Sequence, residues 1–177
     1  ILRADVLDKA IVETTKDIHF NETAWPIINL SPRGHRLTQK MSKNFVKTSG
    51  IILICGRFEG IDQRVIDKYV TNQFSVGDYV LTNGELPTMM MLDSALRLVP
   101  GVLNNIESAL SDTFSLGLLD YPHYTQPRII DDKEVPEVLV SGHHEKIELW
   151  RQNQRESRTR DKRPDLWEKY KKIRKSD

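Results

Sequence analysis

One short segment, residues 75–87, constrains the fold of this chain more than any other part of its sequence. Its residues are mostly small or polar, and it leads directly into an apolar helical stretch that begins at about residue 86. Two earlier loops, residues 30–34 and 55–60, have the same character, and each follows a short apolar run. Turns of this kind often only connect strands to helices, but their exposed backbone amides also suit a ligand. Three such loops at the ends of neighbouring strands would form one pocket.

Apolar runs alternate with helix-like stretches in this part of the chain. The runs at 27–30, 51–55 and 78–81 have the length and composition of buried strands. Between them, apolar residues recur every three to four positions, as they do on one face of a helix. This alternation is typical of a parallel sheet with crossover helices, so we expect an α/β fold. The expected helices cover residues 4–11, 36–48, 61–70 and 86–99.

The last of these helices is apolar on nearly every face. Its segment from Met89 to Leu92 is followed by Ala95, Leu96 and Leu98. A helix of this composition is either deeply buried or packed against a second subunit, and methionine is common in both settings.

Beyond residue 103 the composition changes. Residues 104–115 lack a sustained apolar period and are rich in serine, which indicates a flexible linker between a core domain at 1–103 and a small helical domain at 116–177. Within the helical domain we expect an extended piece at 122–127, a strand at 137–140, and helices at 143–158 and 164–173.

Composition excludes several classes of protein. With 38% hydrophobic and 29% charged residues, the chain has enough apolar surface for a globular core. Its apolar runs are far shorter than the roughly 20 residues that cross a bilayer, so we expect no membrane contact and a cytoplasmic location. The single cysteine, Cys55, excludes an internal disulfide and argues against a thiolate metal site. Because the chain begins at Ile1 and not at Met, we expect that an N-terminal piece precedes it.

Charge is distributed unevenly, although the net charge is only +1. Residues 151–177 contain six Arg and five Lys against three Asp and two Glu. Such a basic segment indicates a polyanion partner, or simply a solvated helix face.

The motifs of the common catalytic and phosphate-binding sites are missing. Neither G-x-G-x-x-G nor G-x-x-x-x-G-K-[ST] occurs, so the loops suit a compact nucleoside better than a nucleotide phosphate. No Ser-His-Asp arrangement is recognisable, and His143 and His144 lack the i, i+4 spacing of a helical zinc site. These histidines cap a helix, bind backbone or contact RNA. Asp112 and Arg97 are candidates for a proton acceptor and for a stabiliser of developing negative charge, or are ordinary exposed charges.

With these residues laid out, the chain resembles the bacterial tRNA (guanine-N1-)-methyltransferases, the TrmD family of the SPOUT superfamily. Six segments carry the resemblance, in the same order along nearly the whole chain: residues 30–34, 55–62, 75–87, 97–103, 117–125 and 140–144.

The resemblance implies a SPOUT methyltransferase fold with a deep trefoil knot, a rare exception to the rule that chains do not thread loops. It further implies that the three loops bind S-adenosylmethionine in a bent conformation, with the adenine bound by backbone groups. Family members are homodimers with each active site at the interface, which assigns the apolar helix to that interface. The C-terminal domain would bind the anticodon region of tRNA. The residues implied to bind the cofactor are Leu30, Ser31, Pro32, Gly34, Gly56, Phe58, Glu59, Gly60, Ser75, Val76, Gly77, Asp78, Tyr79, Val80, Leu81, Asn83, Gly84 and Pro87.

The reaction implied by the resemblance is methyl transfer to N1 of guanosine 37 in tRNA. Asp112 matches the family's proposed general base, and Arg97 matches the arginine that binds O6. Glu59 lies in the segment that contacts the neighbouring guanosine, and Asp120 matches an aspartate near the substrate. The family also implies assistance by Mg²⁺, although no cluster of carboxylates in the sequence predicts a metal site.

Four residues depart from the family pattern: Arg33 replaces a usual glutamine, Phe58 a tyrosine, Asn83 part of a usual glycine pair, and Tyr121 a common cysteine. Phe58 lacks the hydroxyl group, whereas we expect Asn83 to keep the turn because asparagine tolerates positive φ.

Two other functions are compatible with parts of the pattern. A SPOUT enzyme that methylates a ribose 2′-hydroxyl would share the knot and the cofactor but would not require Asp112. A noncatalytic RNA-binding protein would use the basic tail and would have no affinity for the cofactor.

Overall fold

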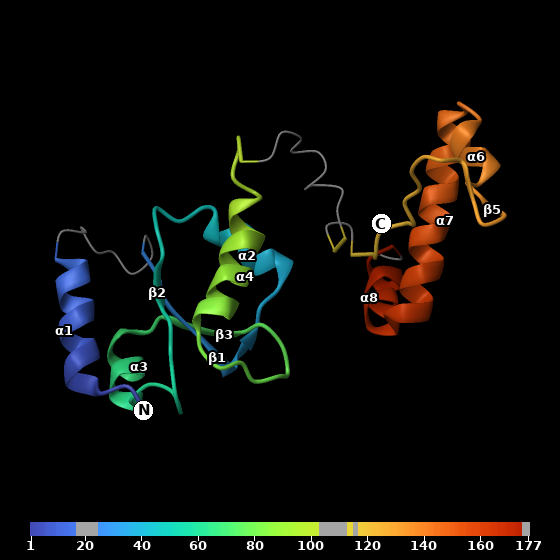
Figure 1. The fold of residues 1–177 in the computed structure, drawn as a ribbon. Coiled ribbons are helices and arrows are strands. Elements are labelled where there is room, and N and C mark those ends of the chain that lie inside the picture. Colours follow the sequence, from blue (N-terminus) through green and yellow to red (C-terminus); the bar gives the residue numbers. More distant parts are fainter. Residues whose placement is uncertain (17–24, 103–112, 115–116, 175–177) are drawn as a thin grey trace. The chain divides into compact units, whose positions relative to one another are not determined.

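The computed structural model describes residues 1–16, 25–102, 113–114 and 117–174 (Figure 1). Its chain divides into two compact units, residues 1–106 and 107–177, which are described separately below. Most of the expected linker at 104–115 lies outside the described residues. None of the described helices combines the length and the apolar character that a membrane crossing needs.

A three-stranded parallel sheet forms the centre of the first unit. Strand β1 (Ile27–Arg36) lies between β2 (Ile52–Ile54) and β3 (Asn72–Ser75), giving the order β2-β1-β3. Ile27 pairs with Ile52, and Leu30 pairs with Phe74. The expected α/β fold with a parallel sheet is therefore confirmed.

Four helices cover the two faces of this sheet. Helices α1 (Ala4–Thr15) and α3 (Gln63–Tyr69) pack on one face, and α2 (Gln39–Phe45) and α4 (Glu85–Leu96) pack on the other (Figure 1). Successive strand residues point to opposite faces, so Ile27 lies in the core beside α1 and α3 while Ile28 lies in the core beside α4. Each half of the sheet therefore has its own apolar core.

The third strand lies earlier in the chain than its sequence suggested. We expected a strand at 78–81, but β3 ends at Ser75, and Tyr79 and Val80 are exposed in the loop that follows. Side-chain hydrogen bonds allow the polar β3 to occupy the sheet: Gln73 Nε2 donates to Asn29 Oδ1 at 3.1 Å, and Asn29 Nδ2 donates to the Ile54 carbonyl at 3.1 Å. Asn29 thus joins all three strands, which an apolar pattern could not reveal.

The helix expected at 36–48 also begins later, because β1 continues through Arg36. A shift of register between Leu30 and His35 lets this second half of β1 follow β3. Gly34 lies within the shifted part, and a Cβ atom there would be 2.5 Å from both the carbonyl carbon of Gln73 and the nitrogen of Phe74. Only glycine fits where the two backbones approach so closely.

The second unit is built around a helical hairpin. Helix α7 (His144–Lys162) packs against α8 (Pro164–Arg174), and the short helix α6 (Glu137–Val140) packs against α7. Thr159 of α7 is fully buried, and its hydroxyl donates to the Arg155 carbonyl at 2.7 Å and accepts from the Leu119 amide at 2.9 Å. Through this contact the segment that enters the unit is fixed to α7.

Residues 137–140 form a helix, so the strand expected there is wrong. Short apolar runs do not distinguish a strand from a buried helical turn, and Pro136 at the N-cap favours the helix. The sequence analysis missed the hairpin just before it, in which β4 (Ile129–Ile130) pairs antiparallel with β5 (Lys133–Glu134). Its two turn residues, Asp131 and Asp132, both have positive φ, which is required in a type I′ turn and tolerated by aspartate.

Replacement of Gly34 by alanine tests the close approach of β1 and β3. We expect Gly34→Ala to lower the free energy of unfolding by about 1–3 kcal/mol, because the added methyl group must push two backbones apart. Urea unfolding followed by circular dichroism measures the change, with His35→Ala as the control because His35 is exposed on the same strand. Equal stability of Gly34→Ala and the unmodified chain would show that the strands do not approach so closely.

Candidate functional site

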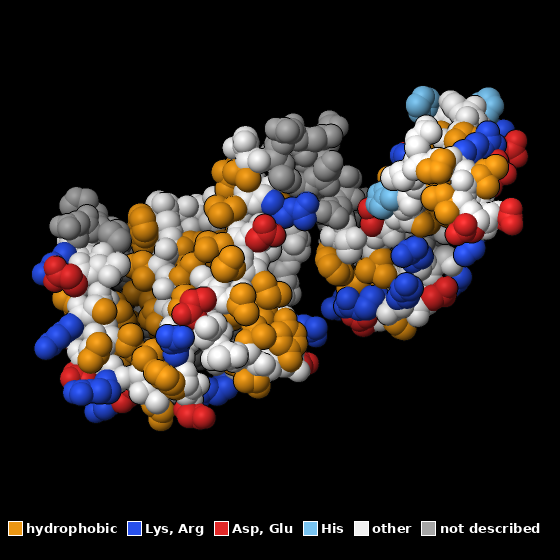
Figure 2. All heavy atoms as spheres, viewed as in Figure 1, with side chains coloured by type: hydrophobic (Ala, Val, Ile, Leu, Met, Phe, Trp, Pro, Cys, Tyr) orange, Lys and Arg blue, Asp and Glu red, His pale blue; other side chains and the backbone are white. Residues whose placement is uncertain are grey.

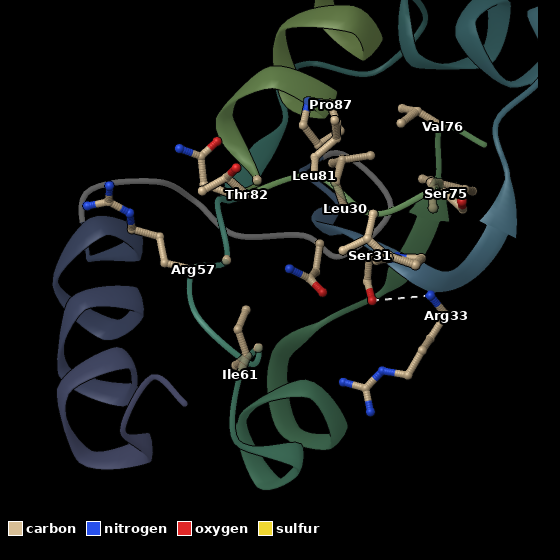
Figure 3. Close-up of a pocket in the computed structure, with 18 of the residues that line it drawn as sticks. Leu30, Ser31, Arg33, Arg57, Ile61, Ser75, Val76, Leu81, Thr82 and Pro87 are labelled. Atoms are coloured by element: carbon tan, nitrogen blue, oxygen red, sulfur yellow. Dashed lines mark hydrogen bonds between the residues drawn. The ribbon is translucent and has the colours of Figure 1, made fainter. Parts of the chain in front are cut away.

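A pocket of about 280 Å³ opens in the first unit where the loops after the three parallel strands meet (Figure 3). The carboxyl ends of parallel strands are the usual place for ligand sites in open α/β sheets. Apart from Gly34 and Asp78, every residue implied to bind the cofactor lines this pocket. The structure thus brings three loops that are distant in sequence into one cavity, as the sequence analysis expected.

Two of the loops are joined directly through their backbones. The Gly84 amide donates to the Gly56 carbonyl at 2.7 Å, and Arg57 forms an isolated antiparallel bridge with Asn83. A Cβ atom on Gly84 would be 2.6 Å from the Gly56 nitrogen. Gly84 is therefore needed for packing, and its absence of a side chain sets the width of the pocket at this point.

The third loop is closed by one buried hydroxyl group. Ser75 Oγ accepts from the Gly77 amide at 3.2 Å and donates to the Gly77 carbonyl at 2.9 Å. These two bonds turn the chain immediately after β3, so that Val76 and Leu81 both reach the pocket. Leu81 lies close to Leu30 and Pro87 in Figure 3, where the three side chains form an apolar wall.

The residues with positive φ in these loops are not the one that we expected. Phe58 has a φ of 57° and Gly60 a φ of 114°, whereas Asn83 is not among the described residues with positive φ. The positive φ that we expected at Asn83 therefore does not occur. Instead, its Oδ1 atom is buried and has no hydrogen-bond partner in the described part of the chain. An unpaired buried acceptor beside a pocket is costly unless a ligand donor satisfies it.

Two implied cofactor residues lie outside the lining. Gly34 is required by the close approach of β1 to β3, so packing explains it without a ligand. Asp78 is exposed in the loop after β3 and does not face the pocket.

The lining also includes residues that the sequence analysis did not select: Asn29, Arg33, Arg57, Ile61, Phe74 and Thr82. Asn29 gave a usable signal, since it is a polar residue within an otherwise apolar strand and is 3% exposed. Arg33, Arg57 and the selected Glu59 are exposed, and they are the charged residues of the lining. Figure 3 shows the side chains of Arg33 and Arg57 extending away from the apolar wall in different directions.

The four residues assigned to catalysis do not come together within the described part of the first unit. Glu59 lines the pocket, whereas Arg97 caps the C-terminal end of α4 and is not part of the lining. Asp120 belongs to the second unit, and Asp112 lies outside the described residues.

Asp120 is the centre of a small ionic cluster. Its carboxylate accepts from the Tyr121 amide at 2.8 Å, lies 3.0 Å from His123 Nε2 and 3.4 Å from Arg155 Nε. Burial of the carboxyl group raises its pKa, but the Tyr121 and His123 hydrogen bonds and the positive charge of Arg155 outweigh burial and leave the pKa below the usual 3.8. Asp120 is thus an anion at neutral pH that positions the segment at the start of the second unit.

Groups of three or more His, Cys, Asp or Glu side chains that could bind a metal ion do not occur among the described residues.

Acidification tests the role of the Asp120 cluster. The pKa of Asp120 is lower in the folded chain than in the unfolded chain. The ionised carboxylate therefore stabilises the fold at pH values above the unfolded pKa of 3.8, and this stabilisation is lost as the pH falls through the lower pKa of the folded chain. We expect Asp120→Asn to lower the free energy of unfolding by about 1 kcal/mol at neutral pH and to flatten its decline below about pH 4. Urea unfolding followed by tryptophan fluorescence at several pH values measures both effects.

Asp161→Asn serves as the control, because Asp161 is an exposed aspartate on α7 whose nearest ion-pair distance, to Arg160, is 3.6 Å. An acid decline that is identical in Asp120→Asn and the unmodified chain would contradict the role given to this cluster.

The chain is similar to known proteins along nearly its whole length. The family model described as tRNA (Guanine-1)-methyltransferase TrmD matches residues 1–169. A protein called tRNA (guanine-N(1)-)-methyltransferase from Cereibacter sphaeroides is 43% identical over 96% of this chain and 68% of its own length. Proteins of the same name from a Ruegeria species and from Pelagibacter ubique are each 47% identical, over 96% and 97% of this chain and 68% and 73% of their own lengths.

Proposed function

The chain belongs to the TrmD family of tRNA (guanine-1)-methyltransferases, and from this membership we propose that it transfers a methyl group from S-adenosylmethionine to N1 of guanosine 37 in tRNA. The observation that carries the proposal is the convergence of three family segments on one pocket of the first unit. S-adenosylmethionine supplies an electrophilic methyl group on its sulfonium sulfur.

The pocket suits the adenosine part of this molecule. Its volume of about 280 Å³ is just below the ~300–1,000 Å³ typical of sites that enclose a whole small molecule, which suits one part of a ligand. Leu30, Leu81 and Pro87 provide an apolar surface for the purine ring, and backbone groups around Gly56 provide polar partners. The unpaired Asn83 Oδ1 is a suitable acceptor for an exocyclic amino group. Because Phe58 lacks the family's hydroxyl group, the aromatic ring alone contributes at that position.

Asp112 would accept a proton from the substrate, and Arg97 would stabilise negative charge on it. In neutral guanine N1 carries a proton and is a poor nucleophile, so a base must accept that proton as the methyl group is transferred. We assign this role to Asp112, and we assign to Arg97 the stabilisation of negative charge that moves onto O6. Glu59 and Asp120 would contact the substrate near the reacting base. Magnesium remains a family expectation in this scheme.

The outward face of α4 supports a homodimer. Pro87, Thr88, Met91 and Ala95 are buried on one side of the helix, but Met89 is 64% exposed on the other. Leu86, Met90 and Leu96 are exposed as well, and Val80 in the preceding loop is 83% exposed. Figure 2 shows apolar side chains gathered on this part of the first unit. A second copy of the chain that covers this face would bring its own catalytic groups to the pocket, as the family arrangement requires.

The same proposal includes the trefoil knot and the assignment of cofactor and tRNA binding to different units. The bond between Gly84 and Gly56 places the chain before α4 directly against the loop after β2, which is compatible with a threaded path. Residues 1–103 would bind the cofactor, and the basic helices α7 and α8 within residues 116–177 would bind tRNA. Arg160 and Lys162 lie in the last turn of α7 and Lys171 lies in the last turn of α8. Arg160 and Lys171 form exposed ion pairs with Asp161 and Glu168, which phosphates would replace on binding.

Methyl transfer to defined tRNA transcripts tests the proposal. The full-length protein should transfer labelled methyl groups to a transcript with guanosine at position 37, with the product mapped to N1, and should not modify a transcript with adenosine there. Asp112→Asn should lower the rate by about 10²–10⁴-fold, the usual contribution of a general base, while binding of S-adenosylmethionine is retained.

Asp67→Asn is the matched control, since it removes one exposed carboxylate on α3 that does not line the pocket. Transfer at full rate by Asp112→Asn would refute the assigned base. A folded protein that binds S-adenosylmethionine but methylates only a ribose 2′-hydroxyl, or that binds tRNA without binding S-adenosylmethionine, would refute the proposed reaction.

A further inference from the structure

A second pocket, of about 420 Å³, lies in the second unit and has no role in the proposed reaction. Its walls are the segment from Tyr121 to Arg128, the apolar side chains of Val135, Leu139 and Val140, and one side of α7 with Ile147 and Arg151. All residues that line this cavity belong to the described part of the second unit.

The two tyrosine rings of this pocket differ in how much of their surface other side chains already cover. Tyr121 already packs against charged groups: the guanidinium carbons of Arg151 and Arg155 lie 4.9 and 4.8 Å from the centre of its ring, and the His123 ring lies at 4.7 Å. Tyr124, in contrast, is 47% exposed, and its neighbouring ring, Trp150, is 6.3 Å away and tilted by 55°. Tyr124 therefore keeps much of its surface open to a flat ligand.

The charged side chains that line the pocket are all basic or potentially basic: His123, Arg128 and Arg151. Each arginine also contacts a carboxylate that is not part of the lining, Arg128 with Glu134 at 2.7 Å and Arg151 with Glu148 at 2.6 Å. These contacts hold the two guanidinium groups in place. The Nε atom of Arg151 is buried and has no hydrogen-bond partner in the described ranges, so this arginine has an unused donor.

We propose that this pocket binds one unstacked nucleotide of single-stranded RNA, with the base on Tyr124 and the adjacent phosphate at Arg128 and Arg151. An exposed aromatic ring beside an apolar wall and fixed guanidinium groups is the combination by which proteins bind single-stranded nucleic acid. A basic lining also favours an anionic ligand, such as RNA, over a peptide that carries few acidic residues. The inference deepens the proposed function, on which it rests, because it adds an RNA contact separate from the cofactor pocket.

Binding of short fluorescent RNAs to the full chain tests this inference directly. We compare a labelled oligoadenylate with an abasic ribose-phosphate oligomer of equal length, because the second offers phosphates without bases. Tyr124→Ala should weaken binding of the oligoadenylate about tenfold and leave the abasic oligomer unaffected. Tyr124→Phe should restore binding, since the phenyl ring still stacks. Arg151→Gln should weaken both ligands and reduce the slope of log affinity against log salt by about one.

Ile130→Ala is the matched control, because Ile130 is 57% exposed on the neighbouring hairpin and does not line the pocket. Binding of S-adenosylmethionine is measured on every variant and should not change, so failure of the cofactor site and failure of this inference are distinguished. Equal affinity of Tyr124→Ala and the unmodified chain for the oligoadenylate would overturn the inference. That result would be expected if the pocket received a protein segment instead of RNA.

Discussion

The close backbone contact between Gly84 and Gly56 determines the shape of the first unit. It brings the loop before α4 against the loop after β2, and the third loop is then added by β3, which Asn29 joins to the other two strands. Neither contact depends on apolar burial. The first needs a residue without a side chain at Gly84, and the second needs the buried amide of Asn29 with partners on both sides. The helices cover the sheet, but these polar and backbone contacts decide where the pocket opens.

Much of this architecture could be predicted from the chain. The apolar runs around Ile28 and Leu53 gave β1 and β2, because buried parallel strands are continuously apolar. The third strand could not be predicted in the same way, since Gln73 contributes through a side-chain hydrogen bond to a residue 44 positions away. The short run at 137–140 was equally ambiguous, because one glutamate followed by three apolar residues fits a strand or one turn of helix, and the tertiary packing on α7 decides between them.

The candidate site was predictable to the extent that it is built from loops. Gly56, Val76 and Leu81 lie in segments with a recognisable pattern, and all three line the pocket. Gly34 belonged to the same pattern but is explained by packing, because a glycine motif does not show whether the missing side chain makes room for a ligand or for another strand. The pocket of the second unit had no comparable signal, since Tyr124, Val140 and Arg151 come from separate elements that only the folded chain brings together.

The central claim is that the three loops of the first unit form the adenosine site of a methyltransferase. A crystal structure of the full-length protein with S-adenosylhomocysteine tests it most directly. We predict that the adenine lies against Leu30, Leu81 and Pro87, with its exocyclic amino group donating to Asn83 Oδ1. Clear density for the nucleoside at any other place, or an empty pocket at a ligand concentration that saturates binding in solution, would contradict the account.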